Sequence, residues 1–213
     1  MNFLDRILYP GIENVSDNGI PERTLITDLE NLPKEQQCYF RPYEYAALQL
    51  KGKVTLDLCC GIGAATHYFS KYANRIEGLD NSNVAIRFAK NHFSKTNTTF
   101  IVGNALNLQY PQESFGAVTF QEAIEHFDSF NQQKVLSEIQ RVLIPGGKLF
   151  FSTPNRELTM GNNVYHFKEL DPEELRRLLE MYFSEVVIKG VTFDDVIHDD
   201  LDGCPILFGR CEK

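Results

Sequence analysis

Two carboxylates and two glycines in the first half of the chain are spaced as in a nucleotide-binding site. Asp57 lies near the end of the apolar run Val54–Leu58, Gly61 and Gly63 follow it, and Asp80 comes 23 residues after Asp57. A strand that leads into a Gly-x-Gly turn lets the backbone approach a ligand closely. A carboxylate at the end of the next strand can accept hydrogen bonds from both hydroxyls of a ribose. These residues therefore predict a nucleoside pocket.

The details of the turn favour a cationic nucleoside over a dinucleotide. A dinucleotide-binding turn usually has a third small residue that seats the following helix, but Thr66 stands at that position. A buried carboxylate such as Asp57 is costly unless it is paired or hydrogen-bonded. Its negative charge would also be unfavourable beside a pyrophosphate. It would lie well beside the ammonium-bearing end of S-adenosylmethionine. We therefore expect this cofactor, and a nicotinamide-dependent oxidoreductase is the more distant alternative.

Several motifs in order along the chain resemble those of the class I S-adenosylmethionine-dependent methyltransferases, of the type 11 and type 12 kind. The turn after Asp57 matches the family's first motif, although Cys59 stands where its first glycine usually lies. Gly103-Asn104-Ala105 resembles the family's adenine-edge turn, with an amide in place of the usual acid. Gly116 replaces a frequent aspartate of the fourth strand. We expect the cofactor to be bound by Asp57, Cys59, Gly61, Gly63, Asp80, Asn81, Asn104, Ala105 and Gln121.

The segment after the fourth expected strand carries side chains that could act on an acceptor. It reads Glu122-Ala-Ile-Glu125-His126, and His166 follows further along the chain. Methyl transfer from a sulfonium is an in-line displacement, so alignment of the acceptor with the methyl group supplies much of the catalysis. A hydroxyl acceptor also benefits from a general base, and imidazole suits that task near neutral pH. We expect His126 and His166 to contact the acceptor as catalytic residues.

The same segment resembles two branches of the family that are associated with a divalent cation. These are the ubiquinone-pathway O-methyltransferases and the small-RNA 2′-O-methyltransferases. The resemblance implies Mg²⁺ or a similar ion on Glu122, Glu125 and His126, with His166 as a fourth ligand. Many methyltransferases of small molecules carry a similar Glu-His segment without a metal, and histidine is not a typical Mg²⁺ ligand. A divalent metal is therefore the less favoured alternative.

Arg41 precedes the first expected strand, between aromatic residues in Tyr39-Phe-Arg-Pro-Tyr43. A guanidinium fork suits two-pronged pairing with a carboxylate. We expect Arg41 to bind the carboxylate of the cofactor. The structural alternative is a surface arginine stacked on the neighbouring tyrosines.

From residue 53 onward the chain alternates strands and helices, which predicts a parallel sheet covered on both faces. Asp171-Pro172-Glu-Glu174 is typical of a capped helix start. Strands are expected at 53–58, 75–79, 98–102, 115–120, 147–152, 185–191 and 205–211. Helices are expected near 63–73, 82–93, 131–143 and 171–182. The fold class is thus a doubly wound, Rossmann-like α/β sheet of seven strands, mostly parallel, with an antiparallel C-terminal hairpin. Residues 1–50 are expected to form a helical or irregular cap and residues 51–213 the methyltransferase core.

Composition fits one globular domain. The chain has 213 residues, 43% of them hydrophobic and 23% charged, and a net charge of −8. Such a balance argues against a general nucleic-acid binder, which needs a basic face. The odd count of five cysteines without C-x-x-C spacing suggests reduced thiols and a cytoplasmic protein. No apolar run is long enough to cross a membrane, so we expect no membrane partner. We expect a monomer or a homodimer.

The function expected from the sequence is methyl transfer from S-adenosylmethionine to a small-molecule acceptor, with oxygen as the methylated atom. Two alternatives stay open. One is an RNA 3′-terminal 2′-O-methyltransferase with a divalent metal. The other is a non-catalytic regulator that binds S-adenosylmethionine, which the departures Cys59 and Gly116 keep open.

Overall fold

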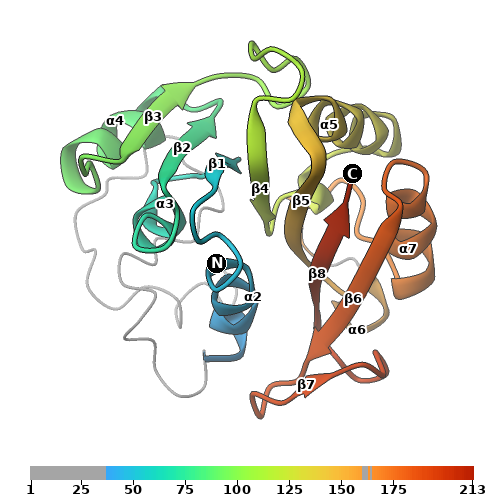
Figure 1. The fold of residues 1–213 in the computed structure, drawn as a ribbon. Coiled ribbons are helices and arrows are strands. Elements are labelled where there is room, and N and C mark those ends of the chain that lie inside the picture. The colour runs from blue at the N-terminus through green and yellow to red at the C-terminus, as the bar shows by residue number, and fades with distance from the viewer. Residues whose placement is uncertain (1–36, 160–162, 164) are drawn as a thin grey trace.

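The computed structural model describes residues 37–159, 163 and 165–213, and its centre is an eight-stranded sheet (Figure 1). The strand order is β3-β2-β1-β4-β5-β8-β6-β7. The strands are β1 (Val54–Leu58), β2 (Arg75–Asp80), β3 (Thr98–Val102), β4 (Phe115–Gln121), β5 (Leu143–Pro154), β6 (Glu185–Val191), β7 (Ile197–His198) and β8 (Ile206–Glu212). Strands β1 to β5 pair in parallel, and β8 runs antiparallel to β5 and β6. The predicted fold class is confirmed, and the structure adds the two-residue strand β7 to the seven expected.

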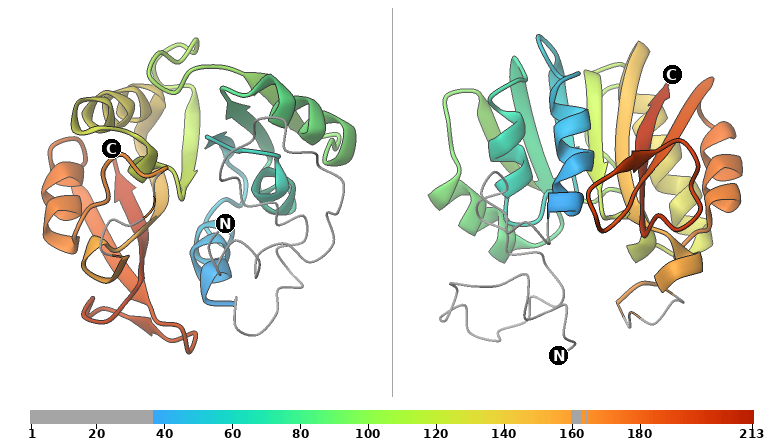
Figure 2. Two further views of the ribbon diagram at one scale, coloured as in Figure 1. Left: turned by 180° about the vertical axis from the view of Figure 1, so that it is seen from behind. Right: turned by 90° about the horizontal axis from the view of Figure 1, so that it is seen from below.

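Helices cover both faces of the sheet (Figures 1 and 2). They are α2 (Gln37–Ala47), α3 (Ala64–Phe69), α4 (Asn83–His92), α5 (Ser129–Val142), α6 (Arg156–Thr159) and α7 (Pro172–Glu180). Successive residues of a strand point to opposite faces. Ala117 and Phe150 accordingly pack with α2 and α3, whereas Val118 and Phe151 pack with α5 and α7. A sheet covered in this way has apolar residues on both faces, which explains the nearly continuous hydrophobic runs of its strands.

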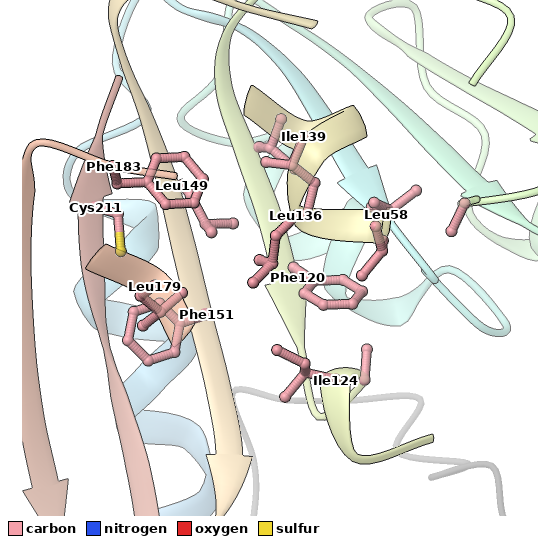
Figure 3. Packing of buried hydrophobic residues seen from close by; sticks show 14 of the residues in the cluster. Leu58, Phe120, Ile124, Leu136, Ile139, Leu149, Phe151, Leu179, Phe183 and Cys211 are labelled. Carbon is pink, nitrogen blue, oxygen red and sulfur yellow. The ribbon is translucent and has the colours of Figure 1, made fainter. Parts of the chain in front are cut away.

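The larger core lies between the sheet and helices α5 and α7 (Figure 3). Leu136 and Ile139 of α5 and Leu149 of β5 are fully buried in it. Burial of such a side chain contributes roughly 1.5–3 kcal/mol. This core fixes β4 and β5 side by side, so the ends of these two strands are held firmly at one edge of the sheet.

Helix α7 begins as its sequence predicts. Asp171 accepts a hydrogen bond from the Glu174 backbone, and the Glu174 side chain accepts one from the Asp171 backbone, which completes a capping box. Leu175 and Leu179 are buried against the core. The amphipathic pattern of this helix therefore matches its packing.

The structure differs from the expected elements in α2 and at the start of β5. Pro42 is buried inside α2 and the helix continues through it, although proline usually interrupts a helix. Strand β5 begins at Leu143, whereas the expected strand begins at residue 147. Leu143 already pairs with Phe115 of β4, and the pairing continues after a register shift. Gly146 in this irregular part has a φ of 71°, a conformation that favours glycine.

Most of the predicted cap falls on residues 1–36, which lie outside the described residues. Its described part, α2, packs against α3 and the faces of β5 and β8. Among the residues that the structure describes, no helix is both long and apolar enough to cross a membrane.

Candidate cofactor and acceptor site

The turn between β1 and α3 needs an unusual backbone at three positions. Cys59, Gly61 and Gly63 have φ angles of 60°, 54° and 90°. Such left-handed conformations cost a residue with a side chain about 1–2 kcal/mol. This explains why glycine is usual where Cys59 stands. At Gly61 a Cβ atom would meet no atom of the described residues within 4 Å, so the part of the chain that the structure describes leaves space for a ligand beside this peptide.

Asp80 ends β2 and holds this turn. Its Oδ2 accepts a hydrogen bond from the Gly61 N–H at 3.0 Å, and its Oδ1 accepts one from the Ser82 N–H at 2.9 Å. The carboxylate is buried but lies directly beside the open space at Gly61. It can accept further hydrogen bonds, because a carboxylate offers about four acceptor positions. The structure thus brings together the predicted pair of Asp80 and the glycine turn.

Asp57 is buried at the inner end of β1 and is satisfied by two hydroxyls. Thr66 donates to its Oδ2 at 2.6 Å, and Thr119 donates to its Oδ1 at 2.7 Å. Burial raises the pKa of Asp57 to about 6, although the two hydroxyl hydrogen bonds act in the opposite direction. Thr66 stands where a dinucleotide-binding turn usually has a third small residue. Its hydrogen bond to Asp57 explains why a threonine suits this position. The role of Thr119 was not predicted, because only the pairing of β1 with β4 brings this residue beside Asp57.

The raised pKa of Asp57 makes the stability of the protein depend on pH. Because the native pKa of Asp57 is about 6 and its ordinary value is 3.8, the native state binds more protons than the unfolded state between these values. The free energy of unfolding should therefore fall as pH rises from about 4 to 6. In Asp57→Asn this group no longer titrates. We expect the free energy of unfolding to depend less steeply on pH, by up to about 1.4 kcal/mol per pH unit, which corresponds to one proton. Urea denaturation across this range measures it.

The matched control is Asp202→Asn, in an exposed loop before β8. We expect this variant to keep the wild-type slope. Equal slopes for wild type and Asp57→Asn would mean that Asp57 titrates alike in both states.

Gln121 ends β4 with a buried atom that lacks a partner. Its Nε2 donates to the Phe150 carbonyl at 3.2 Å, but no residue in the described part of the chain donates to its Oε1. An unsatisfied buried acceptor costs about 1–3 kcal/mol. Gln121 lies at the ligand-facing edge, one strand away from Asp57. The orphan oxygen fits a donor on a bound ligand, such as the ammonium group of S-adenosylmethionine.

The predicted adenine-side residues lie in the turn after β3. Asn104 is exposed, and its Oδ1 accepts a hydrogen bond from the Leu106 N–H at 2.9 Å. Ala105 is buried. Asn81, which we also predicted, is exposed directly after Asp80. The hydrogen bond to Leu106 shapes this turn, and contacts of these residues with a cofactor stay predictions.

Arg41 lies on α2 and pairs with carboxylates of the chain itself. Its Nε and Nη2 donate to the two oxygens of Asp195 at 2.8 and 2.5 Å. Its Nη1 donates to Glu44 at 2.6 Å. The contact between Arg41 and a cofactor carboxylate stays a prediction, and it would require exchange of Asp195 for the ligand. Asp195 belongs to an acidic tract at residues 194–202.

Beyond β4, the structure gathers Glu125, His126 and His166. One nitrogen or oxygen of each lies within 4.8 Å of the others. Glu125 and His126 belong to the 3-10 helix η3 (Ile124–His126), and His166 comes from the segment before α7. The two imidazole rings meet edge to face, with centroids 5.1 Å apart. Glu122, which we predicted as a metal ligand, is not among these three.

The side chains in this cluster are held by further groups. His166 Nδ1 lies 2.5 Å from Glu169 Oε1, and His126 Nδ1 lies 3.1 Å from the Tyr165 carbonyl. Thr153 donates to Glu125 at 2.9 Å. Glu169, which is buried, follows His166 by only three residues, so this His-x-x-Glu spacing is a signal that the sequence does carry.

Two carboxyl groups in this region have raised pKa values. Burial raises the pKa of Glu125 well above its usual range, and the neighbouring Glu122 adds to the effect. Burial also raises the pKa of Glu122, against a hydrogen bond from Ser152. Glu122 has a φ of 46°, an uncommon conformation for glutamate that often marks functional sites. One buried and one half-buried acid therefore lie at the edge beyond β4.

Comparisons with known proteins agree with this geometry. The profile of a family described as a methyltransferase domain matches residues 56–151. The chain is 30% identical over 181 residues to a probable S-adenosylmethionine-dependent methyltransferase of Mycolicibacterium smegmatis, with 80% of this chain and 69% of that protein aligned. It is 33% identical over 111 residues to a ubiquinone biosynthesis O-methyltransferase of Coxiella burnetii, which covers 51% of this chain and 47% of that protein.

Among solved structures, an S-adenosylmethionine-dependent methyltransferase from Mesorhizobium loti is similar in fold. The TM-score is 0.69 at 15% sequence identity, with 87% of this chain and all of that chain covered. The chain thus spans about half of the Coxiella relative and about two thirds of the Mycolicibacterium one.

Proposed function

Because this chain belongs to the class I S-adenosylmethionine-dependent methyltransferases, we propose that it transfers the methyl group to an oxygen atom of a small molecule bound beside His126 and His166. S-adenosylmethionine is the methyl donor of the family. The proposal concerns the acceptor and the residues that act on it.

The observation that carries the proposal is the pair of imidazoles beyond β4. Both Nδ1 atoms face hydrogen-bond acceptors, namely the Tyr165 carbonyl and the Glu169 carboxylate. Nδ1 is then the protonated nitrogen, and Nε2 of each ring keeps the lone pair. On His166 this nitrogen lies 3.1 Å from Asn163 Nδ2. An imidazole with a lone pair suits activation of a hydroxyl, whose proton must leave as it attacks.

The chain's own residues fit the cofactor at the other end of the site. We expect Asp80, which already accepts a hydrogen bond from the Gly61 N–H, to accept hydrogen bonds from the ribose hydroxyls. We expect Gln121 Oε1, which has no donor among the described residues, to accept one from the ammonium group. Asp57 adds negative charge at the inner end of β1. When bound, the cofactor supplies a methyl group that its sulfonium has already activated for displacement.

The reaction then needs little else from the protein. The acceptor oxygen forms a bond to the methyl carbon, and the electron pair of the broken carbon–sulfur bond stays on sulfur. The proton of the acceptor hydroxyl passes to His126 or His166. Alignment of oxygen and methyl group can supply about 7–11 kcal/mol of the barrier reduction.

A small acceptor is favoured over a nucleic acid. The net charge of −8 would repel a phosphate backbone. The Coxiella relative is named as an O-methyltransferase of ubiquinone biosynthesis, which also supports oxygen as the methylated atom.

Labelled methyl transfer tests this function. The protein is incubated with S-adenosylmethionine labelled in the methyl group and a metabolite extract, and the labelled product is identified by mass spectrometry and NMR. We expect a single class of products with the label in a methoxy group. Label on nitrogen or carbon, or label that appears only on RNA, would contradict the proposal.

Gln121 gives a second prediction. In Gln121→Met the orphan oxygen is removed at nearly constant size. We expect the affinity for S-adenosylmethionine to fall about five- to tenfold, about 1–1.4 kcal/mol. The ligand-free stability should change little, because an unsatisfied acceptor and one hydrogen bond are lost together. Calorimetry and urea denaturation measure the two effects.

Gln132→Met is the matched control. Gln132 Nε2 donates to the carbonyls of Ile124 and Lys168, so its loss should lower the stability by roughly 1–3 kcal/mol. The affinity for the cofactor should stay near that of wild type. If Gln121→Met lowers only stability, the oxygen has no role toward the ligand.

A further inference from the structure

We propose that the open edge of β3 and the groove beside it bind an acidic, extended segment of a partner protein. The segment would add to the sheet as a further strand next to β3. This inference concerns the end of the sheet opposite to β7 and does not depend on the acceptor or on the residues that act on it.

Strand β3 has backbone groups that are available for pairing. It lies at one end of the sheet, and among the described strands it pairs only with β2 (Figure 1). The Gly103 N–H donates to the Asp80 carbonyl of β2. Because backbone groups alternate in direction along a strand, those of Phe100 and Val102 point away from β2. On that side they have no backbone partner among the residues that the structure describes.

The sequence of β3 does not protect this edge. Natural proteins usually block an exposed strand edge with charged residues, a proline or a bulge. Strand β3 contains no charged residue and no proline, and its pairing with β2 is regular. Ile101 and Val102 are 37% and 42% exposed. An apolar strand with an open edge of this kind is the structure to which an extended peptide adds.

The groove beside the edge carries positive charge. Arg87 and Lys90 lie three positions apart on α4 and are exposed, and neither forms an ion pair with a described residue. Complementary charge guides the choice of partner at an interface, so these two cations favour an acidic segment. The groove lies between α4 and β3 and is lined by Asn83, Ile86, Arg87, Lys90, Asn91 and Val102.

The sequence around the groove contains no acid, although the chain as a whole is acidic. Residues 81–112, which include α4 and β3, have no aspartate or glutamate, whereas the full chain has 29 in 213 residues. The net charge of −8 therefore arises elsewhere in the chain. This stretch carries no charge of its own that would repel an acidic segment.

An acidic segment fits this edge better than a second copy of the chain or a nucleic acid. Two copies that paired through β3 would bring two grooves with Arg87 and Lys90 to one interface. Like charges that face each other across paired strands are destabilising. A nucleic acid carries negative charge, but its backbone has no N–H groups to pair with a strand.

Peptide binding to the full chain tests the proposal. Three fluorescein-labelled probes are titrated by fluorescence anisotropy: a short peptide that alternates valine and glutamate, one that alternates valine and lysine, and the acidic peptide N-methylated throughout. The last probe cannot donate hydrogen bonds. We expect one acidic peptide per chain, bound at least about tenfold more tightly than either other probe. Its binding should weaken as salt is added, and its amide NMR shifts should map to α4 and β3.

Two variants test the strand edge and the charge separately. Val102→Pro removes an N–H on the open side and keeps the pairing with β2, so it should weaken the acidic peptide about five- to tenfold. Val102→Thr keeps this N–H and should bind as wild type does. Arg87→Glu should weaken binding at least about fivefold. Arg177→Glu, on the exposed side of α7, makes the same change in net charge and should leave the affinity near that of wild type.

Several results would overturn the proposal. They are equal binding of the acidic and basic peptides, no peptide binding, and unchanged affinity in both Val102→Pro and Arg87→Glu. Oligothymidylate that binds in place of the peptide, or a dimer that Val102→Pro dissociates in sedimentation, would assign the edge to another occupant. Circular dichroism shows whether Val102→Pro is folded, and the N-methylated probe tests the edge without a change to the chain. Because no methyl transfer is measured, failure here leaves the proposed function intact.

Discussion

Replacement of Asp80 by alanine is expected to weaken the binding of S-adenosylmethionine at least tenfold and on the order of 100-fold, about 1.4–2.7 kcal/mol. Two effects add. The variant loses a charged acceptor for the ribose hydroxyls, and each such hydrogen bond contributes roughly 1.5–3 kcal/mol. It also releases the Gly61 N–H and Ser82 N–H, so the turn that lies against the ligand is held less firmly. Isothermal titration calorimetry measures the affinity.

Asp80→Asn separates the two effects. An asparagine keeps one acceptor oxygen for a backbone N–H but loses the charge, so its affinity should lie between those of wild type and Asp80→Ala. Urea denaturation without ligand reports how far the turn itself is loosened. Unchanged affinity in Asp80→Ala would mean that Asp80 only shapes the end of β2.

Gly63→Ala is expected to lower the free energy of unfolding by about 3 kcal/mol, through overpacking and an unfavourable φ. A Cβ atom at Gly63 would lie 2.7 Å from the Cβ of Ala89 and 2.7 Å from Cε1 of Phe100. Both contacts are with buried groups of α4 and β3, which have little room to move. The φ of 90° adds a cost that any residue other than glycine would meet. Chemical denaturation measures the loss.

Gly61→Ala is the matched variant, because Gly61 has a similar backbone but, among the residues with described positions, no neighbour within 4 Å of an added Cβ. Its stability should fall by only about 1 kcal/mol, the cost of the left-handed backbone. The new methyl group would, however, stand in the space open to the cofactor, so cofactor affinity should fall. Equal losses of stability in the two variants would show that steric contact at Gly63 is not the cause.

Much of the fold could be predicted from local patterns. Alternating apolar segments, the turn after Asp57 and the capping box at Asp171 each depend on residues close in sequence, and the structure shows the expected elements there. Strand β7 was missed, because two residues paired with the end of β6 carry no periodic signal. The early start of β5 was missed because Pro145 and Gly146 normally end a strand, and here they lie in an irregular stretch of it.

The candidate site could be predicted where it follows the strand ends and not where it depends on loops. The ends of β1, β2 and β4 bring Asp57, Asp80 and Gln121 to one edge, as parallel strands must. Glu169 lies three residues after His166, so the spacing points to the pair, whereas its burial against the imidazole depends on the folded loop. The pairing of Arg41 with Asp195 joins residues 154 positions apart, and only tertiary structure reveals it.

A crystal structure with S-adenosylhomocysteine bound tests the central claim most directly. We predict that the ribose hydroxyls lie within hydrogen-bond distance of the Asp80 carboxylate and that the amino group of the ligand donates to Gln121 Oε1. The sulfur should then point toward the side of His126 and His166. A ligand whose ribose lies away from Asp80, or whose sulfur faces away from the two histidines, would contradict the account.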